Sequence, residues 1–198
     1  MARYQTYLDD SVGLGASAIA GISTQGSIWG IALTPFVGGP NEIAIIADRK
    51  AQYVLGGTFN GSGGENTNTV PVWQTRDLNT EISDRADIVT VSSNQFVLGI
   101  GTYYIDWHSP AIGVGTHQTR LYDVTNGVQV ETGTVGFTTG NASLSVGYAR
   151  TSVNADTTFE IQHCGMNTHL DVGYGGASPF TEGQFTTVKI ERQLDVIP

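Results

Sequence analysis

The chain has 198 residues, of which 14% are charged and 26 are glycine, and its net charge is −9. Only 9 lysines and arginines are present, too few for a surface that grips phosphate groups, so the sequence predicts no nucleic-acid partner. The single cysteine, Cys164, excludes an intrachain disulfide. No apolar run reaches the roughly 20 residues that span a bilayer, and we expect no membrane insertion.

Residues 1–59 form a short, glycine-rich and moderately apolar segment. Its start lacks the cationic and apolar regions of a signal peptide, which favours synthesis in a reducing cytoplasm. A turn is predicted at Asp48-Arg49-Lys50, and strands are predicted at Ser27–Leu33, Glu42–Ala47 and Ala51–Leu55. So small a unit buries too little surface to be stable alone. Either it is an attachment arm that packs on its own C-terminal domain, a sister subunit or another protein, or it completes one larger β domain.

Residues 60–70 are the clearest break in the chain. They consist of glycine, serine, asparagine and threonine with one glutamate, before the valine at position 70. This composition is typical of a flexible linker. We therefore divide the chain into an N-terminal arm at 1–59, a linker at 60–70 and one domain at 71–198.

Short alternating runs separated by turn signals recur through residues 71–198. Thr102–His108 places Tyr103, Ile105 and Trp107 on one face, as strand geometry dictates. The pair Asn126-Gly127 is a strong hairpin signal, because it favours positive φ angles. Further strands are predicted at Asp87–Val91, Gln95–Leu98, Gln118–Val124, Val128–Thr134, Leu144–Ala149, Thr158–His163 and Phe185–Leu194. The sequence predicts an all-β jelly-roll sandwich of about ten strands, with a short β-rich arm before it.

Several strings in this part of the chain occur in a familiar order. They are Trp73–Thr80, Val89–Phe96, Gly101–Ile105, Gly115–Asp123 and Thr157–His163. Their order resembles the C-terminal β-sandwich domains of phage and prophage tail-fibre and head-fibre proteins, which look like the jelly rolls of tumour necrosis factor and of complement globular heads. The resemblance covers about residues 71–198. It implies a homotrimer with a role in adhesion or particle architecture, and it offers no catalytic residues to carry over.

The chain departs from long tail fibres in being short, and segment 1–59 shows neither heptads nor shaft-like repeats. These differences favour a compact, non-enzymatic protein on the outer surface of a virion, assembled in the host cytoplasm. We expect a capsid decoration protein of the cement or head-fibre kind, which binds the major capsid protein or another virion protein and needs no cofactor. The alternative is the receptor-binding head of a tail fibre, which predicts affinity for a host surface glycan. A glycan hydrolase is the more remote alternative, and it predicts turnover that depends on specific carboxylates.

Candidate contact residues follow from these functions. Apolar side chains in segment 1–59 lack a domain of their own to cover them, so we expect them to bind the capsid or another partner. They are Trp29, Ile31, Ile43, Ile45 and Ile46. Tyr174 lies between glycines at 173 and 175, a context that favours exposure, and it is the predicted receptor contact.

Other residues favour structural roles. There is no Gly-x-Ser-x-Gly elbow, and Gly13-x-Gly15 lacks the preceding strand that a dinucleotide loop needs. His163 and Cys164 invite a zinc interpretation, but no ligand spacing supports it, so we expect a hydrogen-bonded core histidine beside a small buried thiol. The acids Asp84, Asp87 and Asp106 are expected at the solvated surface and no metal site is predicted. Core positions are expected for Tyr103, Trp107 and Tyr148.

Overall fold

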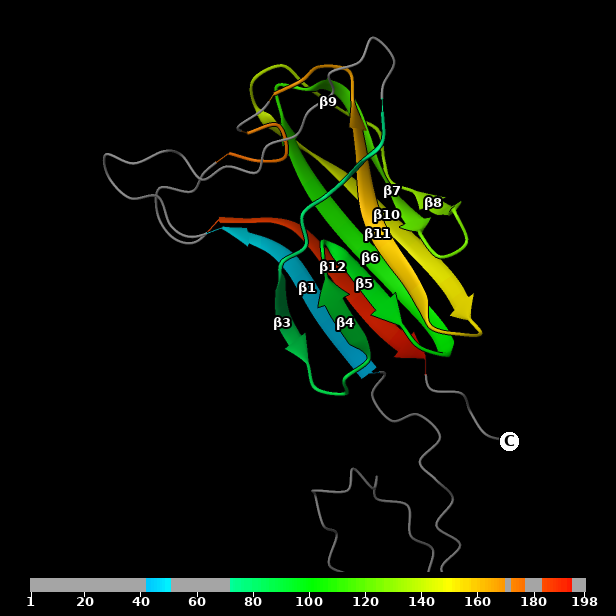
Figure 1. Ribbon diagram of the computed structural model, residues 1–198. Helices are drawn as coiled ribbons and strands as arrows, with labels where there is room; N and C mark the ends of the chain where they lie inside the picture. Colours follow the sequence, from blue (N-terminus) through cyan, green and yellow to red (C-terminus); the bar gives the residue numbers. More distant parts are fainter. Residues whose placement is uncertain (1–41, 51–71, 170–171, 177–182, 194–198) are drawn as a thin grey trace, which may run out of the picture. The chain divides into compact units, whose positions relative to one another are not determined.

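The computed structural model describes residues 42–50, 72–169, 172–176 and 183–193, and every regular element in them is a β-strand (Figure 1). None of the described residues belongs to a helix that is long and apolar enough to cross a membrane. The strands are β1 (Glu42–Lys50), β2 (Gln74–Thr75), β3 (Thr80–Asp84), β4 (Val89–Ser92), β5 (Gln95–Leu98), β6 (Gly101–Ile112), β7 (Gly115–Asp123), β8 (Val128–Thr132), β9 (Gly136–Thr138), β10 (Ala142–Val153), β11 (Thr157–Gly165) and β12 (Gly183–Gln193).

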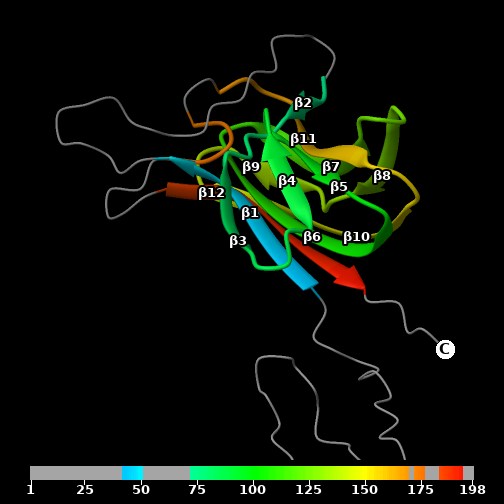
Figure 2. The same cartoon turned by 60° about the horizontal axis from the view of Figure 1, so that its bottom comes forward.

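The strands form two antiparallel sheets that pack face to face (Figures 1 and 2). The first sheet has the order β10-β6-β12-β1-β3. The second has the order β4-β5-β11-β7-β8, and β2 joins it along β11 while β9 joins it along β7. From β5 to β7 and from β10 to β12 each successive strand lies in the opposite sheet, which is the winding of a jelly roll. The predicted fold class is confirmed.

Strand β1 comes from the segment that the sequence assigned to an arm, and it lies inside the first sheet. It pairs with β12 from Glu42↔Arg192 to Lys50↔Gly183, and with β3 on its other side. The sandwich therefore takes in residues 42–50, and the boundary expected at 60–70 does not separate them from it. Asp48, Arg49 and Lys50 continue this strand past a bulge instead of forming the expected turn. Residues 1–41 and 51–71 lie outside the described residues, with the expected strands at 27–33 and 51–55.

The hairpin predicted at Asn126-Gly127 is present, and a second hairpin joins β4 and β5. Ser93 and Asn94 both have positive φ angles between β4 and β5, as a two-residue hairpin turn requires. In the β7–β8 turn only Gly127 is left-handed, at φ 68°. The carboxylate of Asp123 accepts hydrogen bonds from both the main-chain and the side-chain nitrogen of Asn126, and this bonding closes a longer turn.

The apolar core fills one half of the space between the sheets, and Trp107 marks its limit. The indole of Trp107 lies across β10, where a Cβ atom on Gly147 would come within 1.9 Å of the ring. Only small residues fit beneath the indole, so β10 turns Ser145, Gly147 and Ala149 inward. Its large side chains consequently face outward, and the core position expected for Tyr148 is wrong. The expected core positions of Tyr103 and Trp107 are confirmed.

Candidate functional site

The other half of the interior is polar, and a fully buried arginine lies at its centre. Arg76 follows β2, and its guanidinium donates hydrogen bonds to the hydroxyl of Thr186 at 2.7 Å, to the carbonyl oxygen of Pro110 at 3.1 Å and to that of Tyr174 at 2.9 Å. It also lies 4.1 Å from the centre of the Tyr174 ring. Burial lowers the pKa of Arg76 to about 10, and burial raises the pKa of Tyr174 to about 12. The cation is thus held by oxygens and a ring from three separate chain segments.

Two buried histidines extend this polar group across the second sheet. The Nε2 atom of His163 on β11 is 3.3 Å from the Nδ1 atom of His117 on β7, and His117 is hydrogen-bonded through Nε2 to the hydroxyl of Ser143. The His163 ring also meets the edge of Tyr174. Burial and the nearby Arg76 charge lower the pKa of His163 to about 2, and the same causes lower that of His117. Both rings are therefore neutral at physiological pH. The expected core role of His163 is confirmed.

Ser143, His117 and His163 are hydrogen-bonded in a row, as a nucleophile, its general base and an orienting group are in hydrolases. His117 is buried and Ser143 is half-buried beneath β9. A Cβ atom on Gly136 would lie 2.4 Å from Nε2 of His117 and 3.0 Å from the hydroxyl of Ser143, so the chain covers the pair. Gly133 covers the bonded hydroxyls of Thr119 and Ser145 in the same way. The β8–β9 connection closes this edge of the sandwich, and the polar group acts as a structural core.

The outward face of β10 carries a run of exposed apolar side chains. Leu144, Val146 and Tyr148 follow one another along it, with exposures of 54%, 47% and 55%. Main-chain and side-chain hydrogen bonds join Thr134 to Val146, so the β8–β9 connection borders the same edge. Phe137 on β9 is 67% exposed, but it pairs with Thr116 on β7 and faces the outside of the second sheet. We call Leu144, Val146 and Tyr148 the apolar surface.

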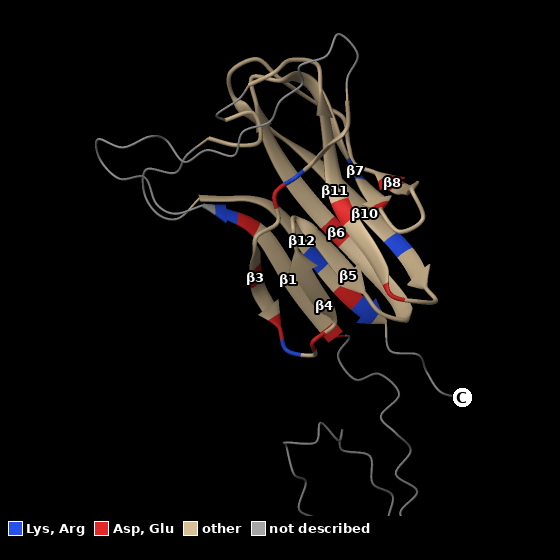
Figure 3. Cartoon of the chain, viewed as in Figure 1, with Lys and Arg blue, Asp and Glu red and all other residues tan. Residues whose placement is uncertain are grey.

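The apolar surface borders charge at its Tyr148 end only. The described stretches 107–119, 133–149 and 183–188 contain no aspartate, glutamate, lysine or arginine, so Leu144 and Val146 lie away from charge. Figure 3 shows the charged residues gathered towards the opposite end of the strands. There, Tyr148 pairs with Asp106 on β6 and stacks on the Tyr104 ring, with 6.0 Å between ring centres. The Arg150 guanidinium lies 5.8 Å from the same Tyr104 ring centre. An apolar centre with charge at its border is typical of a protein interface.

The outward face of the second sheet is polar and rigid. The Arg120 guanidinium lies between two rings, 4.3 Å from the centre of Trp73 and 4.7 Å from that of Tyr122, and donates to the amide oxygen of Gln162 at 2.7 Å. Gln162 in turn donates to the carboxylate of Glu160. These contacts hold long side chains against the strands.

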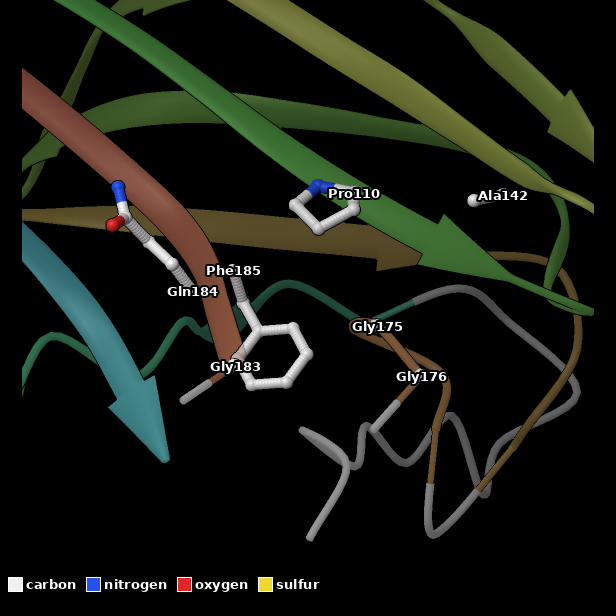
Figure 4. Close-up of a pocket in the computed structure, with 7 residues that line it drawn as sticks. All are labelled: Pro110, Ala142, Gly175, Gly176, Gly183, Gln184 and Phe185. Carbon is white, nitrogen blue, oxygen red and sulfur yellow. The ribbon is translucent and has the colours of Figure 1, made fainter. Parts of the chain in front are cut away.

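Two pockets lie at opposite ends of the sandwich. The first, of about 350 Å³, lies where β6 and β12 separate, and Figure 4 shows the side chains that line it. The Phe185 ring packs against Gly175 and Gly183, where added Cβ atoms would come within 2.2 and 2.9 Å of it. Gly176 and Gly183 border residues 177–182, which lie outside the described residues.

The second pocket, of about 300 Å³, opens between the β7–β8 and β10–β11 connections. Hydroxyl, amide and carboxylate groups form its walls, contributed by Thr125, Asn126, Thr151, Ser152, Asn154 and Asp156. Phe159 and Val153 lie beneath these groups and are themselves almost fully buried. The sequence did not predict this pocket. Its polar residues come from two turns that are separated in the chain by β8, β9 and β10.

The predicted contact residues are distributed differently from expectation. Trp29 and Ile31 lie outside the described residues. Ile46 is wholly buried in the core, so its assignment to a partner surface is wrong, because β1 turns it towards the second sheet. Ile43 and Ile45 point to the opposite side, where Ile43 is exposed, and their partner contact stays a prediction. Tyr174 is 6% exposed and donates from its hydroxyl to Gln74 at 2.9 Å, so the exposure expected for it is wrong.

The acids and the thiol weighed as metal ligands are not brought together. Asp84 accepts a hydrogen bond from the main chain of Val89 in the β3–β4 connection, whereas Asp106 lies in the middle of β6. Among the described residues, no group of three or more histidine, cysteine, aspartate or glutamate side chains is arranged to hold a metal ion. Cys164 is half-buried, and burial raises the pKa of its thiol.

Comparisons with known proteins show similarity at the level of the fold. No protein-family model matches the sequence, and no curated protein matches it either. Among solved structures, the globular domain of a zebrafish complement 1qA protein is similar with 14% identity and a TM-score of 0.48, covering 76% of this chain and 96% of that one. Murine APRIL is similar with 5% identity and a TM-score of 0.49, covering 77% of this chain and 99% of that one. Eiger TNF from S. frugiperda is similar with 10% identity and a TM-score of 0.46, covering 80% of this chain and 96% of that one.

Proposed function

We propose that this chain is a non-enzymatic structural protein that associates with copies of itself into a homotrimer and decorates the outer surface of a bacteriophage capsid. The observation that carries the self-association is the apolar surface on β10. The number of three subunits and the location on a phage particle rest on the resemblance of residues 71–198 to head-fibre and tail-fibre domains.

Physical reasons favour an assembled state. Three large apolar side chains stand exposed on one face of β10, although the interior of the same sandwich contains buried serine, threonine and histidine. Exposed apolar area is stabilised by about 25 cal/mol per Å² when another surface covers it. Leu144 and Val146 lie in a described stretch without charged residues, so covering them imposes no desolvation cost of a buried unpaired charge, whereas Asp106 and Arg150 border Tyr148. A cyclic trimer would bury the same surface on every subunit.

Light scattering on the full chain tests the assembly. We expect a mass three times the 21.0 kDa of the chain. Val146→Glu and Leu144→Glu place a carboxylate in the proposed interface, and we expect each to raise the dissociation constant by about a hundredfold or more. Ile100→Glu is the matched control, because Ile100 is a large aliphatic side chain that is at least as exposed, at 65%, in the β5–β6 turn. A monomeric wild-type chain, or equal effects of all three variants, would contradict the proposal.

Binding to particles tests the role. The purified protein should bind expanded capsid shells of the phage that encodes it and raise their resistance to heat. The monomeric Val146→Glu variant should bind more weakly, because single attachment points lose the gain from multivalency. A protein found in the tail fraction of disrupted particles would contradict the decoration role.

The second candidate function is the receptor-binding head of a tail fibre. The polar pocket between the β7–β8 and β10–β11 connections favours it, because an adhesin needs hydrogen-bonding groups that face solvent. Binding of the protein to intact host cells, with release by soluble host glycan, would support this function. The decoration role requires no such binding.

A further inference from the structure

We infer that the pocket between the β7–β8 and β10–β11 connections binds a neutral sugar ring. This site is separate from the apolar surface and does not depend on where on a particle the protein stands. A surface-exposed sugar site fits either proposed function, so its failure would leave the trimer and the capsid role untouched.

The walls of the pocket are fixed before any ligand binds. Thr125 accepts a hydrogen bond from the main-chain nitrogen of Thr158 at 2.9 Å, which ties the β7–β8 turn to the start of β11. Thr157 donates to the carbonyl oxygen of Ala155 at 2.8 Å, and the Asp123 carboxylate holds Asn126. A preformed pocket loses little conformational entropy on binding.

Some polar side chains that line the pocket are available to bind a ligand. Thr151, Asn154 and Asp156 line it, and none of their side chains makes a hydrogen bond to the described part of the chain. They present a hydroxyl, an amide and a carboxylate. Together these groups donate and accept, which matches the hydroxyl groups of a sugar, since each hydroxyl does both.

Charge and shape narrow the class of ligand. The described residues that line the pocket include two carboxylates, Asp123 and Asp156, and they include no lysine or arginine. Phosphate, sulfate and acidic sugars are therefore disfavoured by repulsion. No tryptophan or tyrosine ring is among the described residues that line the pocket, so it offers no broad slot for a nucleobase. Its volume of about 300 Å³ is at the lower limit of ligand pockets, which suits a single ring.

Buried side chains fix the floor of the pocket. Phe159 and Val153 lie beneath it on β11 and β10, and both are almost fully buried, at 2% and 5% exposure. Phe159 also stacks on Phe96, with 5.8 Å between ring centres. Hydroxyl, amide and carboxylate groups therefore make up most of the surface that a ligand meets, and they match the hydroxyls around the rim of a pyranose.

Saturation-transfer NMR on the full chain tests the site. The probes are the methyl glycosides of glucose, galactose and mannose and N-acetylglucosamine, with N-acetylneuraminic acid as the acidic comparison. We expect transfer to at least one neutral sugar and none to the acidic one. Asn154→Ala combined with Asp156→Ala should weaken binding of that sugar about tenfold or more without altering folding, because both side chains lack hydrogen bonds to the described chain.

Thr90→Ala is the control, since Thr90 is an exposed polar residue on β4 outside the pocket. It should bind the sugar as the wild type does. The inference is overturned if no neutral sugar of the panel receives transfer, if the acidic sugar alone binds, or if the double variant binds as tightly as Thr90→Ala.

Discussion

Arg76 and Tyr174 are joined twice, by the guanidinium lying 4.1 Å from the ring centre and by a 2.9 Å hydrogen bond from Nη2 to the tyrosine carbonyl oxygen. The two residues lie far apart in sequence and belong to segments without regular pairing to each other. The buried cation therefore connects the segment after β2 with the segment before β12. Tyr174 was expected to be exposed because it lies between glycines. Here those glycines permit close packing, since Gly175, at φ 147°, lies against the Phe185 ring.

Replacing Arg76 with methionine should destabilise the fold by about 3–5 kcal/mol. The substitution leaves the hydroxyl of Thr186 and the carbonyl oxygens of Pro110 and Tyr174 without their guanidinium donor, at about 1–3 kcal/mol for each buried group left unsatisfied. Arg76→Lys should cost about 2 kcal/mol, because an ammonium group cannot reproduce the planar fork. Urea unfolding of each variant measures the free energy of unfolding.

Arg85→Met is the control for Arg76, because Arg85 is exposed in the turn after β3. It should change stability by less than about 0.5 kcal/mol. Methionine sometimes replaces a buried charge with a gain in stability. A stability of Arg76→Met equal to or above that of the control would show that the buried cation is not needed to hold these segments.

The fold should lose stability in mild acid through its buried histidines. Burial lowers the pKa of His163 to about 2, whereas in the unfolded chain it returns to about 6.5. Because the folded pKa is the lower one, the unfolded chain binds more protons below pH 6.5. The stabilisation that the fold gains from the neutral His163 ring is complete above pH 6.5 and decreases as the pH falls. At pH 4.5 we expect His163 alone to cost about 2–3 kcal/mol relative to pH 7.5.

Urea unfolding midpoints at pH 7.5 and 4.5 measure the loss of stability on acidification. The His163→Gln variant should lose less stability than the wild type. The variant is less stable at pH 7.5, because its side chain does not fill the place of the ring beside Tyr174. His108→Gln serves as control, since His108 is exposed on β6, and it should keep the wild-type loss. If His163→Gln lost as much stability on acidification as the wild type, the neutral buried ring would not be the cause.

The sequence predicted the strands because the period-2 pattern is a local property, and most runs, such as Gln95–Leu98, coincide with observed strands. What it missed depends on distant partners. Strand β1 was separated from its domain because the composition of residues 60–70 resembles a linker, while its partner β12 lies at the other end of the chain. The orientation of β10 was missed because Trp107 on β6 decides it. The polar interior was missed for the same reason, since Arg76, His117 and His163 come from three segments.

The close packing of Gly147 under Trp107 gives a final prediction. Gly147→Ala places a Cβ atom within 1.9 Å of the indole and forces it out of its site, which also breaks the 2.8 Å hydrogen bond from Nε1 to the hydroxyl of Thr119. We expect a loss of about 3 kcal/mol in urea unfolding, together with a red shift of tryptophan fluorescence.

Gly140→Ala is the matched control for Gly147, because a Cβ atom at position 140 has no neighbour within 4 Å. It should leave stability unchanged or raise it by up to about 1 kcal/mol, since alanine restricts the unfolded chain. If both alanine variants were equally stable, the indole would have room to move, and the outward orientation of Leu144, Val146 and Tyr148 would need another cause. A selective loss at Gly147 would mean that the packing of Trp107 creates the apolar surface on β10.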